Sequence, residues 1–420
     1  MRSIEVLVIG AGASGLVAAI EAARQGKKVL LIEKNDKLGK KILATGNGRC
    51  NFTNQYQDKS CYRSQEPEKA WSVLEQFNAQ ETIEWFQKIG ILATDKEGYV
   101  YPASFQATAV QRALEREVNH LGIETLPGCA VQSVEQHISF KQGICDGYIV
   151  NTERDSYLAK QVILCTGGMA APAQGSTGDG YQFAKCLGIE CSSLYPALTS
   201  LKVCGDHGKL WAGCRVQGEV CLENENGEKI AGDAGELQFV SYGISGIPVF
   251  QISRFAGAFL EQGKKLFVLI DSVPAYSEAW LYDELMRRKK YDELFKSGCL
   301  LESIIPDPYA KAILSSCGIS LKTYVKDISE EKIKQIVHQL KQFRVEVSAV
   351  SPFEKAQTTA GGVCLSQMNL ETLEVHGLEG FYITGELLDV DGICGGYNLQ
   401  WAWTTGIIAG RAAGKKEKKA

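Results

Sequence analysis

The stretch IEVLVIGAGASG (Ile4–Gly15) joins an apolar, β-branched run directly to three glycines in the spacing GxGxxG. Such a run is typical of a buried parallel strand. In this motif Gly10 would allow a tight turn, Gly12 would let the backbone approach a pyrophosphate, and Gly15 would let the next helix pack closely on the strand. The start of that helix carries free N–H groups and a partial positive charge, which favour binding of a diphosphate.

A second strand is predicted at Lys28–Ile32 and ends in Glu33, which lies 18 residues beyond Gly15. A carboxylate at about this spacing commonly binds ribose hydroxyls. Glycines alone occur in many turns, so the alternative is a glycine turn in an unrelated α/β protein. Strand, glycines, helix, second strand and acid together favour a dinucleotide-binding fold.

The composition is that of a globular protein. The chain has 420 residues, of which 45% are hydrophobic and 22% are charged, and this length predicts two to three domains. The formal net charge of -4 gives no overall attraction to phosphate backbones, so nucleic acid is not an expected partner. The charged run Lys415–Lys419 is expected to be a solvated tail.

Cysteine usage indicates a reducing compartment. The 14 cysteines form no CxxC pair and no Cys/His cluster with zinc-ligand spacing, so no metal site is expected. Unpaired cysteines favour a cytoplasmic location. The apolar run Val6–Ile20 has neither a basic leader nor a cleavage site and is too short to span a bilayer, so no signal sequence and no membrane association are expected.

Two later regions favour a flavin over a nicotinamide as the bound dinucleotide. A strand predicted at Gln161–Cys165 leads into Thr166–Gly168, a turn typical of the place where flavoproteins return beside the cofactor. Another strand, Gly380–Thr384, leads to Gly385 and Glu386, and Gly395–Asn398 then opens a long helical pattern. The start of that helix would stabilise negative charge on a reduced flavin. Both chain ends would therefore build one dinucleotide domain, with the middle of the chain as an insertion.

Four segments also carry a family resemblance: Lys40–Asn51, Gly175–Gly180, Thr358–Val363 and Gly385–Trp403. Together they resemble the BaiN-type family of bacterial NAD(P)/FAD-dependent oxidoreductases, which includes a bile-acid 4,6-reductase and aminoacetone-oxidase-like proteins. The resemblance extends from Met1 to about Gly414.

The predicted fold class is α/β. A Rossmann-like FAD-binding domain of the glutathione-reductase type is expected from residues 1–190 and 350–420. A β-rich, barrel-like subdomain is expected at 191–275 and 325–349, and it carries a small helical subdomain at 276–324. Short strands with glycine turns, followed by helices predicted at 277–290, 308–316 and 329–341, support this insertion. Ligand sites favour domain boundaries, so the substrate is expected between the insert and the flavin.

The first half of the chain also contains two segments with apolar residues at helical spacing, Glu66–Lys88 and Ser104–Leu121. Ser104 is a credible N-cap for the second helix. The stretch Glu124–Val134 is predicted to be one strand.

The motifs and the resemblance imply a set of site residues. Few catalytic groups are needed if a flavin carries the hydride chemistry. The candidates are Arg49 for an anionic or carbonyl group, Asp391 for a proton, and Tyr397 and Asn398 beside the flavin edge. The expected cofactor-binding residues are Gly10, Gly12, Ala13, Ser14, Gly15, Glu33, Lys34, Lys40, Lys41, Gly46, Asn47, Arg49, Cys50, Asn51, Val131, Thr166, Gly167, Gly168, Gly385, Glu386, Gly396, Tyr397, Asn398 and Leu399.

The resemblance implies an FAD-dependent oxidoreductase that passes electrons from NAD(P)H to an organic acceptor, such as the activated C=C bond of a steroid-like, bile-acid-type enone. No second GxGxxG is present in the insert, so NAD(P)H would dock transiently. Dithiol chemistry is not expected, because Cys50 is followed only by Cys61 and not by a CxxxxC partner. Two alternatives stay open: a flavin-dependent amine or amino-ketone oxidase, and a non-catalytic FAD-binding or RNA-associated protein. The substrate, the choice between NADH and NADPH, and the oligomeric state stay open as well.

Overall fold

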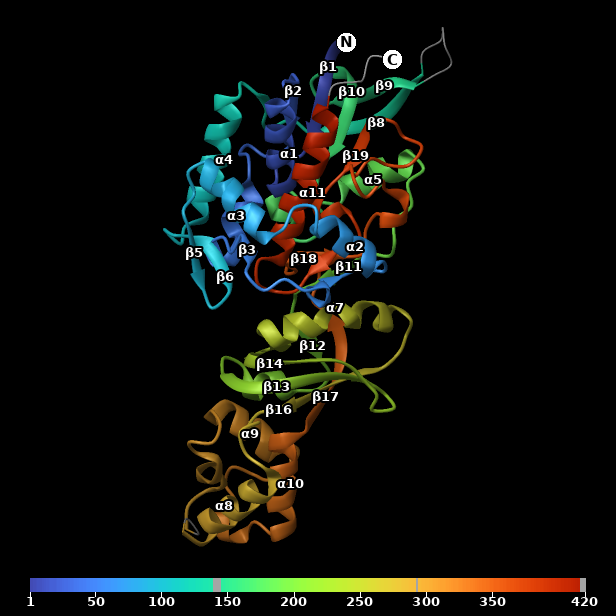
Figure 1. Ribbon diagram of the computed structural model, residues 1–420. Coiled ribbons are helices and arrows are strands. Elements are labelled where there is room, and N and C mark those ends of the chain that lie inside the picture. Colours follow the sequence, from blue (N-terminus) through green and yellow to red (C-terminus); the bar gives the residue numbers. More distant parts are fainter. Residues whose placement is uncertain (139–144, 292–293, 416–420) are drawn as a thin grey trace. The chain divides into compact units, whose positions relative to one another are not determined.

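The computed structural model describes residues 1–138, 145–291 and 294–415 (Figure 1). The chain divides into two compact units. One consists of residues 1–194 together with the chain from 358 onward, and the other of residues 195–357. The first unit therefore contains both the N-terminal and the C-terminal segments, as the sequence analysis expected.

The first unit is built around a seven-stranded sheet with the order β7-β2-β1-β10-β9-β8, in which β19 also pairs with β10. Strands β7, β2, β1, β10 and β19 are parallel to one another, whereas β9 runs antiparallel to both of its neighbours, β10 and β8. Strands β2 and β19 and the second half of β1 are buried on both faces, which explains their nearly continuous apolar sequence. The strands are β1 (Arg2–Ile9), β2 (Val29–Ile32), β7 (Glu124–Leu126), β8 (Val131–Ile138), β9 (Cys145–Thr152), β10 (Ser156–Leu164) and β19 (Phe381–Ile383).

Helix α1 (Ala13–Arg24) lies directly against helix α11 (Tyr397–Gly414), as Figure 1 shows. Two glycines of α11 make this contact close. A β-carbon added at Gly406 would stand 2.3 Å from the carbonyl oxygen of Ser14, and one added at Gly410 would stand 2.4 Å from that of Ala18. Small residues thus let the two backbones touch, and this packing joins the C-terminal segment to the N-terminal motif.

A buried carboxylate strengthens the same junction. Glu21 of α1 accepts hydrogen bonds from Trp85 Nε1 at 2.9 Å, from Arg24 at 2.8 Å and from Arg411 Nε at 2.8 Å. Burial acts to raise the pKa of Glu21, but these donors and the charge of Arg411 outweigh it, and the pKa is lowered. The carboxylate therefore stays ionised and links the first and last helices of this unit.

Smaller elements complete the first unit. They are η1 (Lys40–Gly48), β3 (Thr53–Asn54), β4 (Tyr62–Arg63), α2 (Pro67–Leu74), α3 (Ala79–Lys88), β5 (Ala93–Lys96), β6 (Tyr99–Pro102), α4 (Ala107–His120), α5 (Asp179–Cys186) and β20 (Asp391–Gly392). Strands β3, β6 and β5 form one small sheet, and β4 pairs with β20.

The single helix predicted at Glu66–Lys88 is wrong, because two helices occupy this range. Helix α2 ends at Leu74, and Asn78 starts α3. The Asn78 side chain accepts from the Glu81 N–H at 3.1 Å, and the Glu81 carboxylate accepts from the Asn78 N–H at 2.8 Å. This reciprocal pair forms a capping box, which is a strong start signal inside an otherwise periodic sequence.

Two further predictions in this region need correction. Ser104 does not cap the next helix, which begins at Ala107 after Phe105 adopts a φ of 51°. The strand predicted at Glu124–Val134 is two strands, β7 and β8, because Gly128 with a φ of 62° turns the chain between them.

The second unit contains a closed six-stranded barrel with the order β12-β15-β14-β13-β16-β17, which confirms the predicted barrel-like insert. Buried and exposed residues alternate along β13 and β16, as expected for strands with one face toward a core. The elements are β12 (Leu201–Val203), β13 (Arg215–Asn224), β14 (Lys229–Val240), β15 (Gly243–Ser245), β16 (Leu266–Asp271) and β17 (Phe343–Val350), with α7 (Ile247–Glu261) packed on β14.

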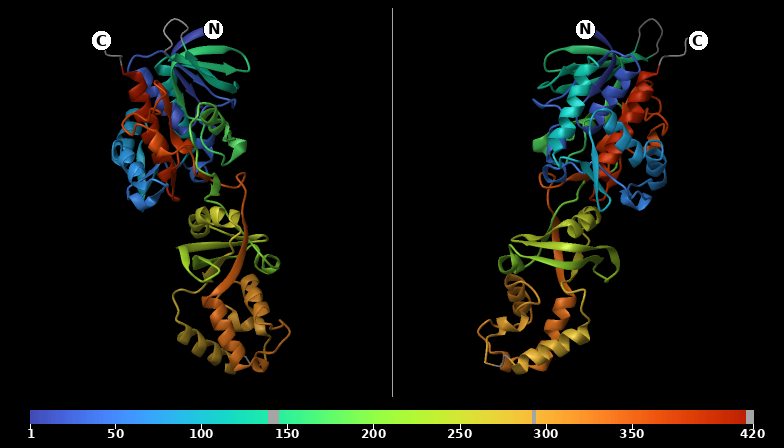
Figure 2. Two further views of the ribbon diagram at one scale, coloured as in Figure 1. Left: turned by 90° about the vertical axis from the view of Figure 1, so that its right-hand side faces the viewer. Right: turned by 60° about the vertical axis from the view of Figure 1, so that its left-hand side comes forward.

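A group of helices lies at one end of this barrel (Figure 2). They are α8 (Glu278–Tyr291), α9 (Asp307–Ser316) and α10 (Glu330–Lys341), and the sequence predicted each of them closely. Helix α10 packs on α8 and α9. Residues 325–349, which include this helix, were predicted to belong to the β-rich subdomain. The finer domain boundaries stay a prediction. Apart from Lys415, the predicted tail at Lys415–Lys419 lies outside the described residues.

Within the described ranges, no helix has both the length and the apolarity that crossing a bilayer requires.

Candidate functional site

The three motif glycines have different surroundings. A β-carbon at Gly10, whose φ is 97°, would stand 2.6 Å from the carbonyl oxygen of Cys165, and one at Gly15 would stand 1.8 Å from that of Gly10. At Gly12 the space is open, because no atom lies within 4 Å of an added β-carbon. The turn and the helix packing therefore require glycine at two positions, while the third leaves room in front of the α1 N-terminus. This arrangement suits a bound diphosphate.

A small cavity lies next to this turn. Among its lining residues are five that the sequence predicted to contact a cofactor: Gly10, Glu33, Lys34, Val131 and Thr166. The Thr166 hydroxyl is buried and has no hydrogen-bond partner among the described residues. A β-carbon at Gly180 would stand 2.0 Å from this hydroxyl oxygen, so the hydroxyl packs against the start of α5.

Glu33 directly follows β2 at the edge of this cavity, and hydrogen bonds hold it in a fixed orientation. Its Oε2 accepts from the Ala11 N–H at 2.7 Å, and its Oε1 accepts from the backbone and side-chain N–H groups of Asn35 at 2.8 and 2.7 Å. Two carboxylate oxygens offer about four acceptor positions. Glu33 therefore keeps capacity to accept from the hydroxyls of a ribose.

Lys34 closes the cavity from one side. Its ammonium group lies 2.6 Å from Asp179 Oδ2 and also contacts the Thr177 hydroxyl. The cavity measures about 40 Å³, which accommodates a few water molecules and no adenosine. Both partners of the ion pair are partly exposed, and pairs of this kind contribute little, so a ligand can displace them at small cost.

The residues expected near the middle of the cofactor meet beside the start of α1. Lys41 Nζ lies 2.8 Å from Glu386 Oε2. A β-carbon at Gly168 would stand 2.7 Å from Glu386 Oε1, and one at Gly385 would stand 2.7 Å from Ser14 Oγ. The fold thus brings together predicted site residues from the N-terminal, central and C-terminal parts of the chain.

The last residues of η1 and the loop that follows it are strained and tightly anchored. Asn47 and Cys50 both have a φ of 56°, which is uncommon outside glycine. Asn51 Nδ2 donates to the carbonyl of Thr53 at 2.9 Å, and a β-carbon at Gly396 would stand 2.6 Å from that same oxygen. The loop and the start of α11 therefore share one anchor, and the predicted residues Gly46–Asn51 lie near Gly396–Leu399.

The candidate catalytic residues differ in their surroundings. Both amide atoms of Asn398 bind Gly392: Oδ1 accepts from its N–H and Nδ2 donates to its carbonyl, each at 2.8 Å. This geometry gives Asn398 a structural role in holding β20. Asp391 is fully buried on the same strand, whereas Arg49 is exposed on the loop after η1.

Tyr397 is buried at the first position of α11. Its hydroxyl hydrogen-bonds with the Cys61 thiol, and its ring meets that of Tyr62 edge-on at 5.6 Å. Burial, followed by the contact with Cys61, raises the pKa of Tyr397, so this hydroxyl is a proton donor rather than a base at neutral pH. Burial likewise raises the pKa of the Cys50 thiol to about 12, which disfavours a redox role.

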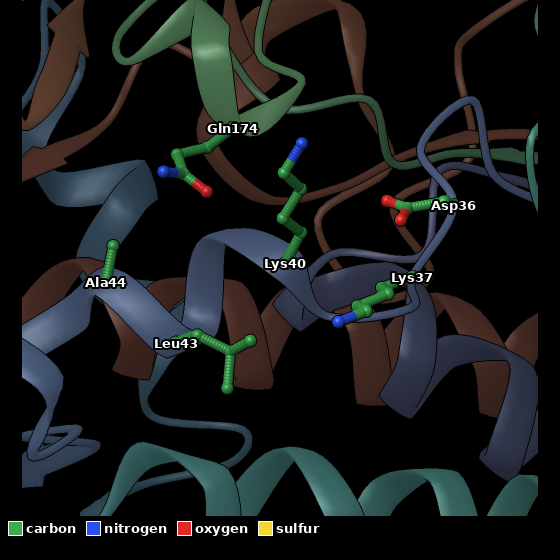
Figure 3. A pocket seen from close by; sticks show the side chains of 6 residues that line it. All are labelled: Asp36, Lys37, Lys40, Leu43, Ala44 and Gln174. Atoms are coloured by element: carbon green, nitrogen blue, oxygen red, sulfur yellow. The ribbon is translucent and has the colours of Figure 1, made fainter.

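A second pocket, of about 440 Å³, lies beside η1 (Figure 3). Lys40 points from η1 into the space that Gln174 borders from the opposite side. Asn35 connects this pocket to the small cavity, since its Oδ1 accepts from Lys40 Nζ at 3.3 Å and its Nδ2 donates to the Gln174 carbonyl at 3.3 Å. Lys37 and Lys40 bring two positive charges to this pocket and Asp36 brings one negative charge, which favours binding of an anionic group. The lining residues are Asp36, Lys37, Lys40, Leu43, Ala44 and Gln174.

Sequence reasoning missed several residues of the site. Asp179 and Phe183 line the cavity, and the Thr359 hydroxyl accepts from the N–H groups of Met169 and Ala170 at 2.8 and 3.2 Å. Asp179 and Thr359 lie in segments that carried the family resemblance, which was the available signal. In the parts of the chain that the structure describes, no cluster of three or more His, Cys, Asp or Glu side chains could hold a metal ion.

Comparison with known proteins supports the same assignment of fold. A solved structure of 3-ketosteroid delta1-dehydrogenase from Sterolibacterium denitrificans, in complex with 1,4-androstadiene-3,17-dione, superposes with a TM-score of 0.53 at 12% identity, covering 99% of this chain and 100% of that chain. At this identity the likeness concerns the fold alone.

Two relatives match almost end to end. The 3-dehydro-bile acid delta(4,6)-reductase of Clostridium scindens is 38% identical over 417 residues, which cover 97% of this chain and 98% of the relative. The ribosomal RNA dihydrouridine synthase of Haemophilus influenzae is 28% identical over 401 residues, or 96% of each chain. The family model described as HI0933-like protein Rossmann domain matches residues 4–412. The resemblance to the bile-acid 4,6-reductase family is confirmed, and the chain belongs to the HI0933-like family of Rossmann-domain proteins.

Proposed function

We propose that this chain is an FAD-dependent oxidoreductase that reduces a C=C bond conjugated with a carbonyl group. The observation that carries the proposal is the open space at Gly12, between two positions where only glycine fits, at the N-terminus of α1. The space would receive the diphosphate of FAD, and Glu33 would accept from the adenosine ribose. Lys41 and Glu386 would lie along the middle of the cofactor, with Gly396–Leu399 at its flavin end.

Bound FAD would supply the hydride chemistry, so this chain's own residues must orient the acceptor and manage one proton. Tyr397 can hold a proton, because its pKa is raised by burial first and then by Cys61. Asn398 is occupied with Gly392 and would serve by keeping α11 in place. Arg49 is exposed on the loop after η1, and its guanidinium suits an anionic or carbonyl group.

The substrate we favour is a small, steroid-like enone. The C. scindens relative is named a delta(4,6)-reductase of a 3-dehydro-bile acid, and it shares 38% of its residues with this chain. In such a compound the 3-oxo group withdraws electrons from the double bonds and makes a ring carbon accept hydride. The net charge of -4 also fits a small molecule better than a polyanion.

A second candidate is reduction of uridine in ribosomal RNA. The H. influenzae relative, named for that activity, matches 96% of this chain. The C5=C6 bond of uracil is conjugated with the C4 carbonyl, so the hydride step is chemically the same. The two candidates differ in substrate class and not in reaction type.

Anaerobic mixing tests the proposal directly. NADH or NADPH should bleach the flavin absorption of the purified protein, with the hydride passing from the nicotinamide. A 3-oxo-4-ene steroid acid should then restore the absorption, and a uridine-containing ribosomal RNA fragment should do so if the second candidate holds. Absence of bleaching with either nicotinamide counts against the reductase. If instead an amine or amino ketone bleaches the flavin, and oxygen added afterwards restores its absorption, the oxidase is favoured.

A further inference from the structure

Strand β6 presents aromatic side chains to solvent. Its residues alternate in burial, with Val100 and Pro102 packed inward and Tyr99 and Tyr101 on the opposite face. Tyr99 is 39% exposed. Aromatic rings contribute most when they are buried, so neighbouring rings left at the surface indicate a binding face.

Phe105 extends this face at a cost in backbone strain. It is also 39% exposed, and its ring centroid lies 5.3 Å from that of Tyr101. Its φ of 51° is unfavourable for a bulky residue. Strain of this kind persists where the surrounding structure enforces it, often at ligand sites. We call Tyr99, Tyr101 and Phe105 the aromatic patch.

Arg49 lies next to the aromatic patch. Arg49 lies two residues before Asn51, whose Nδ2 donates to the carbonyl of Val100 in β6 at 2.9 Å. The positive charge of Arg49 also acts to lower the pKa of Tyr101, against the effect of burial. Within the described residues, no carboxylate forms an ion pair with Arg49. A planar, exposed guanidinium beside aromatic rings is suited to an anion whose apolar part lies on those rings.

The aromatic patch borders the segments proposed for the flavin end of the cofactor. A β-carbon at Gly395 would stand 2.9 Å from a ring carbon of Tyr99, and Asn54 Nδ2 donates to the Gly395 carbonyl at 3.0 Å. Arg49 belongs to the loop that shares an anchor with the start of α11. The patch is therefore contiguous with the place where a hydride acceptor has to lie.

We propose that the aromatic patch and Arg49 bind the substrate, and that the substrate is a planar, conjugated carbonyl compound bearing an anionic group. The rings cover one face of the conjugated system, and Arg49 binds the anion. This inference rests on the proposed function, because it assigns the acceptor side of the same site.

Binding to the FAD-loaded protein tests the assignment without turnover. A 3-oxo-4-ene bile acid and its uncharged methyl ester are titrated separately in the absence of NAD(P)H, and the shift of the flavin absorption bands gives each Kd. Arg49→Gln should raise the Kd of the acid about 10- to 100-fold and leave that of the ester unchanged, since hydrogen bonds to charged groups are of this size. Arg49→Lys should restore part of the affinity for the acid.

Tyr101→Leu should weaken acid and ester alike, by about 3- to 10-fold, because both compounds share the conjugated rings. The matched control is Arg112→Gln, which removes an exposed arginine of α4 and should change neither Kd. A uridine-containing RNA oligonucleotide forms a third titration. If the oligonucleotide, and not the steroid acid, shifts the flavin bands, and if Arg49→Gln raises the Kd of the oligonucleotide, the bound anion is a phosphate and the patch assignment stands.

The assignment is overturned if Arg49→Gln and Tyr101→Leu bind every effective ligand as the unmodified protein does, or if neither ligand class shifts the bands. Failure of the proposed function has a different signature. In that case the protein takes up no FAD, or NADH and NADPH both fail to bleach it, before any acceptor is added.

Discussion

Gly12→Ala should separate cofactor binding from folding. Gly12 is the N-cap of α1 with φ −76° and ψ −164°, a conformation open to alanine, and no atom lies within 4 Å of the added carbon. Replacing glycine by alanine at an N-cap costs about 0.5–1 kcal/mol. The reduced freedom of the unfolded chain offsets this by about 0.4–1 kcal/mol. The free energy of unfolding should therefore change by no more than about 0.5 kcal/mol.

FAD affinity should fall steeply in the same variant. The added methyl group occupies the space that a diphosphate needs, and it holds the ligand away from the α1 N–H groups. Loss of two charge-assisted hydrogen bonds, at about 1.5–3 kcal/mol each, predicts a rise in Kd of about 100-fold or more. Titration of the apoprotein with FAD, followed by quenching of flavin fluorescence, measures this change, and urea unfolding measures stability.

Gly15→Ala is the matched control. Its β-carbon would stand 1.8 Å from the carbonyl oxygen of Gly10, so the backbone of the turn has to move. We expect a loss of about 3 kcal/mol or more in the free energy of unfolding. The reasoning is refuted if Gly12→Ala binds FAD as tightly as the unmodified protein, or if it loses as much stability as Gly15→Ala.

Three further predictions concern stability and reactivity. Glu21→Gln should lower the free energy of unfolding at pH 7 by about 1–3 kcal/mol. Because the folded-state pKa of Glu21 is lowered from 4.5, this difference should be fully present above pH 4.5 and shrink as the pH falls below it, as urea unfolding at several pH values will measure. Asn398→Ala should destabilise the protein by about 1–3 kcal/mol through the lost bonds to β20, whereas unchanged stability with lost turnover would instead indicate a direct catalytic role. Burial raises the pKa of Cys50 and Cys165 to about 12, so iodoacetamide at pH 8 should label the exposed Cys186 and Cys204 before either of them, and mass spectrometry showing rapid labelling of Cys50 in the folded protein would contradict this.

Much of this fold could be predicted from the sequence, because the turns and helices concerned are determined by residues close together in the chain. The roles of Gly10, Gly12 and Gly15 follow from backbone sterics within one turn, and the structure shows two packed positions and one open position. Helices α8, α9 and α10 were predictable because their apolar faces repeat at helical spacing. The site residues at the carboxyl ends of β1 and β2 followed from the same strand-and-glycine pattern.

The sequence predictions failed where a capping residue interrupts a helical pattern of apolar residues, or where a contact joins residues far apart in the sequence. Asn78 carries a capping signal inside a helical pattern, and periodicity alone merges α2 with α3. The contact between Thr359 and the turn at Met169 joins residues 190 positions apart, so the spacing of residues along the chain could not predict it. The aromatic patch depends on the positive φ of Phe105, which only the surrounding structure enforces.

We propose that the two chain ends together enclose one FAD molecule. The most direct test of this proposal is to release the cofactor from the purified, folded chain by acid and to quantify it chromatographically against the protein. We expect the released cofactor to be FAD, and not FMN, at about one molecule per chain, either as purified or after incubation with FAD and gel filtration. A colourless protein that still retains no FAD after that incubation would contradict the account.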